Sequence, residues 1–279
     1  MNQDIINKVK DRKIYLKSLD KVYNTNPSLA VIVTSFNHKS NIPALVKGLR
    51  KCTEIEEIIV CEDGSVDGSL EEWDNLLDFP NDFIIRSNDL HEIRSTDRAI
   101  RLSRAGICCI VQDDDELTED NSWHHEAMRI FEKYPKLGIL GGYLGYHNFF
   151  DSHIGRPNGR KRIKAGPQFS FVEHVNIGPF FIRKRFFEEI GGWDFNISQP
   201  GEMGLGLDHE ICYRMWLNGY QVGHYIPYKY GNDTALLGGT HVLGGRSKQL
   251  EFIQKYIPDK YGSDMDEVTK FVKYCNDNR

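Results

Sequence analysis

Three consecutive aspartates, Asp113, Asp114 and Asp115, stand at the end of a short apolar run, residues 107–111, with one glutamine between. Like charges this close repel one another, and at the end of a buried strand they reduce stability unless something neutralises them. A divalent cation is the usual neutralising partner, since Mg²⁺ and Mn²⁺ prefer hard oxygen ligands. The run by itself is equally compatible with a solvated acidic turn.

The composition is that of an ordinary globular protein, with 40% hydrophobic and 27% charged residues among 279. This length suffices for one large domain or for one domain with appendages. The net charge of −5 argues against a nucleic-acid partner, because such partners usually meet a basic surface. No apolar run reaches the roughly 18 residues that span a bilayer. The N-terminus does not resemble a signal peptide, and peripheral membrane association stays open.

The six cysteines show no CxxC spacing, and most of them fall in apolar segments. We therefore expect reduced, buried thiols, no zinc site and a cytoplasmic protein.

Short apolar runs alternate with helical patterns along the first half of the chain. The predicted strands are residues 29–34, 55–60, 83–86 and 107–111, and the predicted helices are residues 41–50, 70–77, 96–104 and 122–134. Asn41 is expected to cap the first of these helices, with Pro43 in its first turn. This alternation predicts an α/β fold with a doubly wound, mostly parallel central sheet flanked by helices.

Two acidic turns follow predicted strands: Glu62-Asp63 after the second, and the aspartate triplet after the fourth. In open parallel sheets, ligands bind beyond the carboxyl ends of the strands. Both turns should therefore face one crevice, which favours a functional acidic cluster over two unrelated turns.

The second half has longer irregular segments. Residues 151–168 are polar and basic and predict a mobile loop, which either closes over an anionic ligand or is simply solvated. Further helices are predicted at residues 185–190, from Asp208 to Asn218, and at residues 247–256 and 265–275.

Several short motifs together resemble family 2 glycosyltransferases of the GT-A fold, and they occur in the family's order over roughly residues 29–248. They are VIVTSFN at 31–37, EDGSVDGS at 62–69, the DDD triplet as a DxD element, GP at 178–179, GGWD at 191–194, and LDHEICYR at 207–214. The resemblance implies a domain at residues 29–248, preceded by a helical lead-in at 1–28 and followed by C-terminal helices at 249–279. Within it, residues 29–141 would bind a nucleotide sugar and 142–248 an acceptor.

The resemblance also implies which side chains bind the nucleotide: Thr34, Phe36, Asp63, Arg98, Asp113 and Asp114. Phe36 would offer an aromatic face to the base, or would pack in the core instead. Asp63 would accept hydrogen bonds from base or ribose, since a carboxylate takes several donors, or would form an Asx turn. Arg94 competes with Arg98 for the same role.

By the same resemblance, Asp115 is the first choice for a direct ligand of Mn²⁺ or Mg²⁺, supported by Asp113. Asp114 remains an alternative, and His241 is a candidate for a second contact to the metal or diphosphate. A metal bridging the diphosphate oxygens would stabilise the leaving group.

Asp208 is the expected general base, which deprotonates the acceptor hydroxyl. Leu207 replaces the family's usual acidic neighbour, so Glu210 is the alternative base. Asp208 would otherwise only cap its helix. Trp193 and Asp194 are expected beside the acceptor, although Trp193 also suits the core.

The resemblance thus implies an inverting, metal-dependent glycosyltransferase of polysaccharide biosynthesis that uses a nucleotide-diphosphate sugar, with a UDP-sugar favoured. Its acceptor would be a glycan or another hydroxyl compound. A nucleotidyltransferase is disfavoured because residues 34–39 lack a glycine-rich phosphate loop. A non-catalytic nucleotide- or carbohydrate-binding protein is the other alternative, for which Leu207 is the one indication.

Overall fold

The structure is a computed structural model. It describes residues 28–117, 122–142, 144–148, 152–155, 169–198, 202, 204–225, 230–231 and 246–279. The predicted lead-in at 1–28 lies outside this part of the chain, apart from Ser28. Most of the basic segment 151–168 also lies outside it.

An eight-stranded sheet forms the centre, in the order β3-β2-β1-β4-β11-β6-β12-β9. Neighbouring strands among β3, β2, β1 and β4 are parallel, as are β6 and β12. Strand β11 runs antiparallel to β4 and β6, and β9 runs antiparallel to β12. The predicted mostly parallel α/β sheet is therefore confirmed. The strands are β1 Leu29–Ser35, β2 Ile55–Glu62, β3 Phe83–Arg86, β4 Ile107–Gln112, β6 Leu137–Gly141, β9 Phe169–Phe171, β11 Phe180–Arg183 and β12 Gln221–Tyr225.

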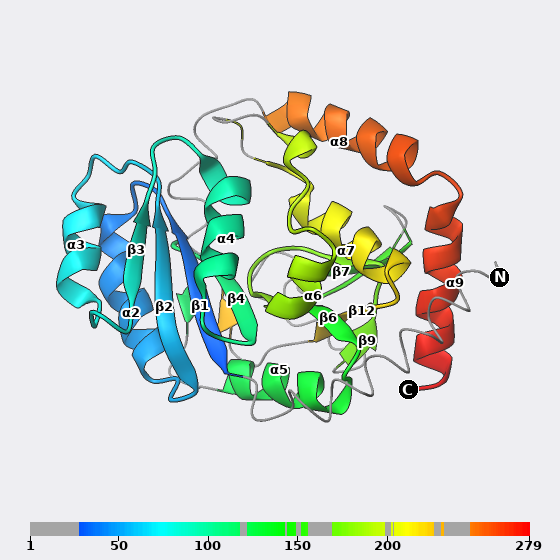
Figure 1. Cartoon of the computed structure of the whole chain (residues 1–279), viewed down its shortest axis with the longest axis horizontal. Coiled ribbons are helices and arrows are strands. Elements are labelled where there is room, and N and C mark those ends of the chain that lie inside the picture. The colour runs from blue at the N-terminus through cyan, green and yellow to red at the C-terminus, as the bar shows by residue number, and fades with distance from the viewer. Residues whose placement is uncertain are drawn as a thin grey trace.

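Helices flank this sheet, and α4 lies against β1 and β2 (Figure 1). The helices are α2 Ile42–Arg50, α3 Ser69–Leu76, α4 His91–Leu102, α5 Ser122–Lys133, α6 Lys184–Glu189, α7 Leu207–Leu217, α8 Arg246–Tyr261 and α9 Asp264–Asp277, with 3₁₀ turns η1 Lys39–Asn41 and η2 Phe195–Ile197. Two small sheets complete the fold, built from β7 Leu144–Asn148, β8 Ser152–Gly155 and β10 His174–Val175, and from β5 Glu116–Leu117 and β13 Tyr230–Gly231.

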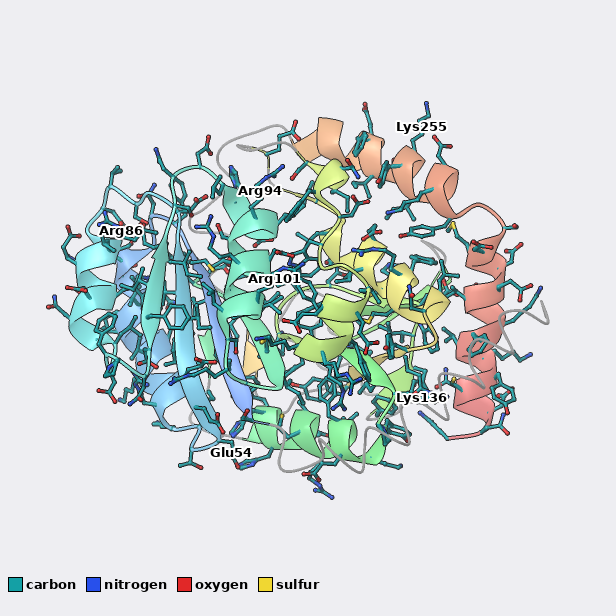
Figure 2. All side chains as sticks on the ribbon, viewed as in Figure 1. Glu54, Arg86, Arg94, Arg101, Lys136 and Lys255 are labelled. Atoms are coloured by element: carbon teal, nitrogen blue, oxygen red, sulfur yellow. The ribbon has the colours of Figure 1, made fainter. Side chains whose placement is uncertain are left out.

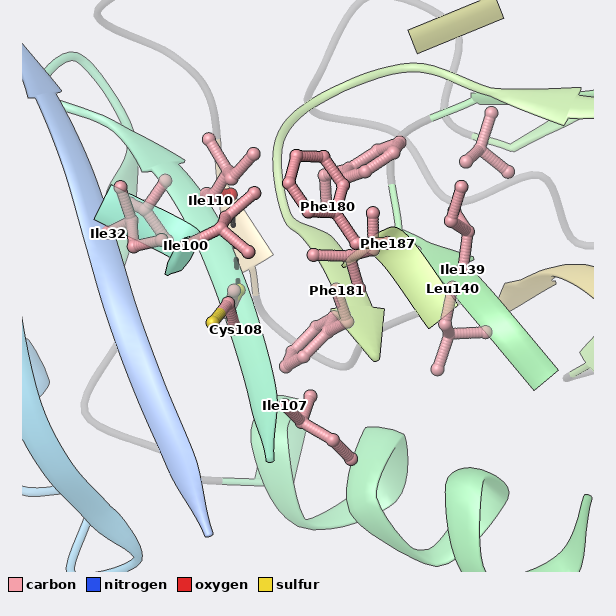
Figure 3. Packing of buried hydrophobic residues seen from close by; sticks show 14 of the residues in the cluster. Ile32, Ile100, Ile107, Cys108, Ile110, Ile139, Leu140, Phe180, Phe181 and Phe187 are labelled. Atoms are coloured by element: carbon pink, nitrogen blue, oxygen red, sulfur yellow. Dashed lines mark hydrogen bonds between the residues drawn. The ribbon is translucent and has the colours of Figure 1, made fainter. Parts of the chain in front are cut away.

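The core surrounds the middle strands of the large sheet. Residues 107–111 of β4 are fully buried, as expected for a parallel strand with both faces covered. Figure 3 shows Ile100 of α4 beside β4, and Phe181 of β11 between β4 and β6. This packing fixes β4, and with it the aspartates that follow.

Helix α4 begins five residues earlier than predicted, at His91 instead of residue 96. The carboxylate of Asp63 accepts hydrogen bonds from the backbone N–H groups of Leu90, at 2.9 Å, and His91, at 2.8 Å. These donors belong to the helix N-terminus, which otherwise leaves them unsatisfied. The cap comes from the turn after β2, so local sequence gave no sign of it.

The C-terminal helices are longer than predicted, and they confirm the helical extension. Helix α9 covers the edge strand β9. There the side-chain amide of Asn276 accepts from the backbone N–H of Phe171, at 3.0 Å, and donates to its carbonyl, at 2.9 Å. Pairing of this kind protects the open edge of a sheet.

All six cysteines are free and buried, as predicted. Burial raises the pKa of Cys52 to about 12, so this thiol stays protonated. Within the described residues, we find no helix with the length and apolar character needed to cross a bilayer.

Gly141, at the end of β6, tests how tightly this core is packed. A Cβ added at Gly141 would lie 2.4 Å from the Cβ of Val175. We expect Gly141→Ala to lower the free energy of unfolding by about 1–3 kcal/mol through overpacking. The measurement is urea denaturation. Gly106→Ala is the control, since a Cβ there meets nothing within 4 Å. An equal loss in both variants would contradict this account.

Candidate active site

The turn after β4 is hydrogen-bonded to the turn after β1. The backbone N–H of Asp113 donates to the carbonyl of Thr34, at 3.1 Å. The carboxylate of Asp113 accepts from the backbone N–H of Phe36, at 2.8 Å. Thr34, Phe36 and Asp113, predicted to share a nucleotide site, therefore lie together at the carboxyl edge of the sheet.

Asn41 is the N-cap residue of α2, as predicted, and its side chain supports this turn. Its side chain makes no capping hydrogen bond to α2. Its Nδ2 instead donates to the carbonyl of Asp113, at 2.6 Å, and to that of Asp115, at 3.4 Å. The predicted N-cap position is correct, but no side-chain capping hydrogen bond forms, because the amide is directed to the acidic turn.

The three aspartates differ in their exposure. Asp115 is 1% exposed, Asp113 is 9% exposed, and Asp114 is half-buried. One oxygen of Asp115 accepts from the backbone N–H of Gln112, at 2.9 Å. Nδ1 of His38 lies 3.7 Å from the carboxylate of Asp113, and its interaction with this carboxylate raises the pKa of His38. A donor set made only of oxygens fits Mg²⁺ or Mn²⁺.

Glu92, at the start of α4, belongs to the same cluster, and sequence reasoning missed it. Its carboxylate accepts from Nε2 of Gln112, at 2.8 Å. Burial raises the pKa of Glu92 to about 7, and repulsion from Asp208, Asp114 and Asp113 adds to the effect. Glu92 therefore experiences the negative charge of carboxylates from both halves of the chain. Glu92 follows β3, the third parallel strand along the chain, and only this position in the sheet topology could have indicated a role for Glu92.

Asp208 is the second residue of α7, and the N-cap of this helix is Gly206. The carboxylate of Asp208 accepts from Nδ2 of Asn176, at 3.2 Å, and from the backbone N–H of Ile177, at 3.3 Å. Asp208 thus turns toward the segment before Gly178-Pro179. Its other oxygen accepts from the backbone N–H of His209, at 3.0 Å, so Asp208 also satisfies one free N–H of the first turn of α7.

Glu210, the alternative base, is fully buried. It accepts from Nε of Arg214, at 2.7 Å, from Nζ of Lys260, at 2.7 Å, and from the hydroxyl of Tyr261. A carboxylate held by two cations in the interior cannot reach an acceptor hydroxyl. Glu210 therefore has a structural role, since its ion pair with Lys260 joins α7 to α8.

Asp194 belongs to the same charged network, which also involves α8. Its carboxylate accepts from the hydroxyl of Tyr256, at 2.6 Å, and from Nζ of Lys260, at 2.7 Å. Burial alone would raise the pKa of Asp194, but these hydrogen bonds outweigh it and lower the pKa to about 2. If Asp194 also contacts the acceptor, as predicted, it does so while accepting these structural hydrogen bonds.

Trp193 lies in the core. Its side chain is 3% exposed, and its ring packs 5.5 Å from Phe187 and 6.0 Å from Phe180 between centroids. The predicted stacking platform for a sugar needs an open aromatic face, which this arrangement does not provide. Trp193 is therefore a core residue, which was the alternative to an acceptor contact.

The remaining predicted residues are divided between structure and surface. The carboxylate of Asp63 accepts hydrogen bonds from the start of α4 and from the hydroxyl of Ser87, at 2.8 Å. Arg98 is exposed on α4. Arg94 instead reaches the carbonyl of Ser198, at 3.1 Å, and lies over the ring of Phe195. His241 lies outside the described residues.

Comparisons with known proteins bear on this arrangement. The model of the family described as "Glycosyl transferase family 2" matches residues 30–191. The crystal structure of S. aureus TarS is similar with a TM-score of 0.50 at 18% identity, covering 73% of this chain and 36% of that chain. TarS 1-349 in complex with UDP-GlcNAc gives a TM-score of 0.49 at 16% identity, covering 73% of this chain and 57% of that one. This chain thus spans well under two thirds of either. The first likeness confirms the predicted GT-A fold. No curated protein matches the sequence.

The pKa of Asp194 predicts an acid-sensitive contribution to stability. The ordinary value is 3.8 and the folded value is about 2, so the contribution is complete above about pH 4 and is lost as the pH falls toward 2. We expect Asp194→Asn to cost roughly 2 kcal/mol at neutral pH, with a gap from the parent protein that narrows below pH 4. Urea denaturation at several pH values measures this. Asp259→Asn, on the exposed face of α8, is the control, and a pH-independent gap would contradict the assignment.

Proposed function

Because the chain belongs to glycosyl transferase family 2, we propose that it is an inverting, metal-dependent enzyme. It transfers a sugar from a nucleotide-diphosphate donor, with a UDP-sugar as first candidate, to an acceptor hydroxyl. One observation carries the proposal. Repulsion from Asp113 and Asp114 of the donor half and from Asp208 of the acceptor half contributes to the raised pKa of Glu92, which supports a site shared by the two halves. A nucleophile activated by Asp208 would therefore meet a donor held at the aspartate turn.

The donor half supplies binding. Thr34 and Phe36 lie at the end of β1, where the base and ribose of a nucleotide would lie beside Asp113. Asp115 with Asp113 would hold the divalent cation, and Asp114 is the alternative ligand. When bound, that cation supplies Lewis-acid stabilisation of the departing diphosphate. His38, 3.7 Å from Asp113, would balance part of the negative charge when protonated, and the interaction with Asp113 raises its pKa.

The acceptor half supplies the base. Asp208 takes the proton from the acceptor hydroxyl, whose oxygen attacks the anomeric carbon opposite the diphosphate, so the configuration is inverted. Hydrogen bonds from Asn176 and Ile177 fix the orientation of the carboxylate. Glu210 holds the helix that carries Asp208 against α8 through its ion pair with Lys260. A positioned base of this kind typically contributes about 10² to 10⁴ in rate.

Asp208→Asn tests the base. We expect sugar transfer to fall by about 10²- to 10⁴-fold, because an amide cannot accept the proton. Nucleotide affinity should stay nearly unchanged. Transfer is measured as release of nucleoside diphosphate from the sugar nucleotide, and binding is measured by calorimetry.

Asp266→Asn is the matched control, since Asp266 is an exposed aspartate in the first turn of α9. Comparable turnover by Asp208→Asn and the parent protein would place the base elsewhere.

A calorimetric panel of UDP, GDP, dTDP and CDP, each with and without Mn²⁺, tests the donor site. We expect metal-dependent binding of one nucleotide, UDP first. Asp115→Ala should weaken that binding by at least about tenfold by removing a carboxylate ligand. Asp74→Ala, which removes an exposed carboxylate on α3, should leave it unchanged. Equal Mn²⁺ dependence in both variants would refute the ligand role of Asp115.

A further inference from the structure

Two adjacent histidines and a glutamate meet at the other end of the sheet. Glu54 directly precedes β2, and His124 and His125 lie in the first turn of α5. The carboxylate of Glu54 lies 2.5 Å from Nε2 of His124 and 2.7 Å from Nδ1 of His125. One ligand atom from each residue lies within 4.8 Å of the other two. This cluster is the Glu54 triad.

The Glu54 triad is separate from the candidate active site. The acidic turns follow the carboxyl ends of the parallel strands, whereas Glu54 stands before the first residue of β2. The eight residues of β2 span about 25 Å. Figure 2 shows Glu54 beside α5 at the lower edge of the sheet.

The Glu54 triad is buried on one side and open to solvent on the other. The side chain of His124 is 0% exposed, whereas those of Glu54 and His125 are 41% and 50% exposed. The two imidazole rings lie 4.2 Å apart between centroids and are inclined by 30°. A fixed inner ligand therefore faces two outer ligands that can adjust to an ion arriving from solvent.

We propose that Glu54, His124 and His125 bind a divalent transition metal, with Zn²⁺ as the best fit. Two imidazole nitrogens and one carboxylate form a ligand set that zinc commonly uses, with water in the fourth position. This set differs in kind from the aspartate turn, whose oxygen donors suit Mg²⁺ or Mn²⁺. The two sites would therefore select different ions.

The observed distances permit the coordination. Zinc bonds of about 2.0–2.1 Å place neighbouring ligand atoms roughly 3.3 Å apart in a tetrahedron. An outward movement of less than about 1 Å by the exposed Glu54 and His125 would open that space. The bound ion would tie α5 to the segment that leads into β2.

The sequence did not indicate the proposed site. Cysteine spacing gave no indication of zinc, and all six thiols are indeed free. The histidines are neighbours in the chain, but Glu54 lies 70 positions away from His124, so only folding assembles the set.

Zinc titration of the chelator-treated full chain by calorimetry tests the site. The parent protein is compared with Glu54→Gln, His125→Ala and the control Glu56→Gln, which removes an exposed carboxylate two positions from Glu54. We expect one Zn²⁺ equivalent to be lost, or weakened at least about tenfold, in the first two variants and retained in the control. The aspartate turn is unchanged in all four proteins, so any zinc it binds cancels from the comparison.

Thermal unfolding provides a second, independent test of zinc binding at the Glu54 triad. Zn²⁺ should raise the unfolding midpoint of the parent protein and of Glu56→Gln, but not that of Glu54→Gln or His125→Ala, because only a metal bound to the folded state stabilises it. Equal zinc stoichiometry in all four proteins, or no zinc bound by the parent protein, would overturn the proposal. In either case the two histidines would serve only as hydrogen-bonding partners of Glu54.

Discussion

The hydrogen bonds between the end of β1 and the turn after β4 determine the geometry of the carboxyl edge. Phe36 donates to the side chain of Asp113, Asp113 donates to Thr34, and Asn41 holds the carbonyls of the aspartate turn. Donors directed at this turn offset part of the repulsion among the three carboxylates. Every proposed donor contact depends on this arrangement.

The acceptor half depends on a second set of charges. Glu210 is fully buried and accepts from Arg214 and Lys260, and a buried carboxylate of this kind requires such partners. Because Lys260 also binds Asp194, the network joins α7, α8 and the turn after α6. Asp208 stands two residues from Glu210 on the same helix. The structural carboxylate therefore fixes the helix that presents the proposed catalytic one.

Much of the fold could be predicted from the sequence because its signals are local. Continuous apolar runs predicted β3 at residues 83–86 and the start of β4 at residue 107, both as observed. The start of α4 was misplaced because its cap comes from Asp63, in another element. Asn41 stands at the predicted N-cap of α2, but its side chain makes no capping hydrogen bond, because its amide is directed to the acidic turn. The sheet direction of β11, antiparallel between β4 and β6, also came only from the structure.

The sequence by itself determined the fold class, the family, and the strand ends at which the acidic residues stand. It did so because strand and helix periodicity and short motifs are properties of neighbouring residues. Only the tertiary structure decided the roles of chemically similar side chains. It turned Asp208 toward Asn176 and buried Glu210 among cations, placed Trp193 in the core, and brought Glu92 among the aspartates. A carboxylate or an aromatic ring acquires its role from its partners and its burial, and residues distant in the chain supply both.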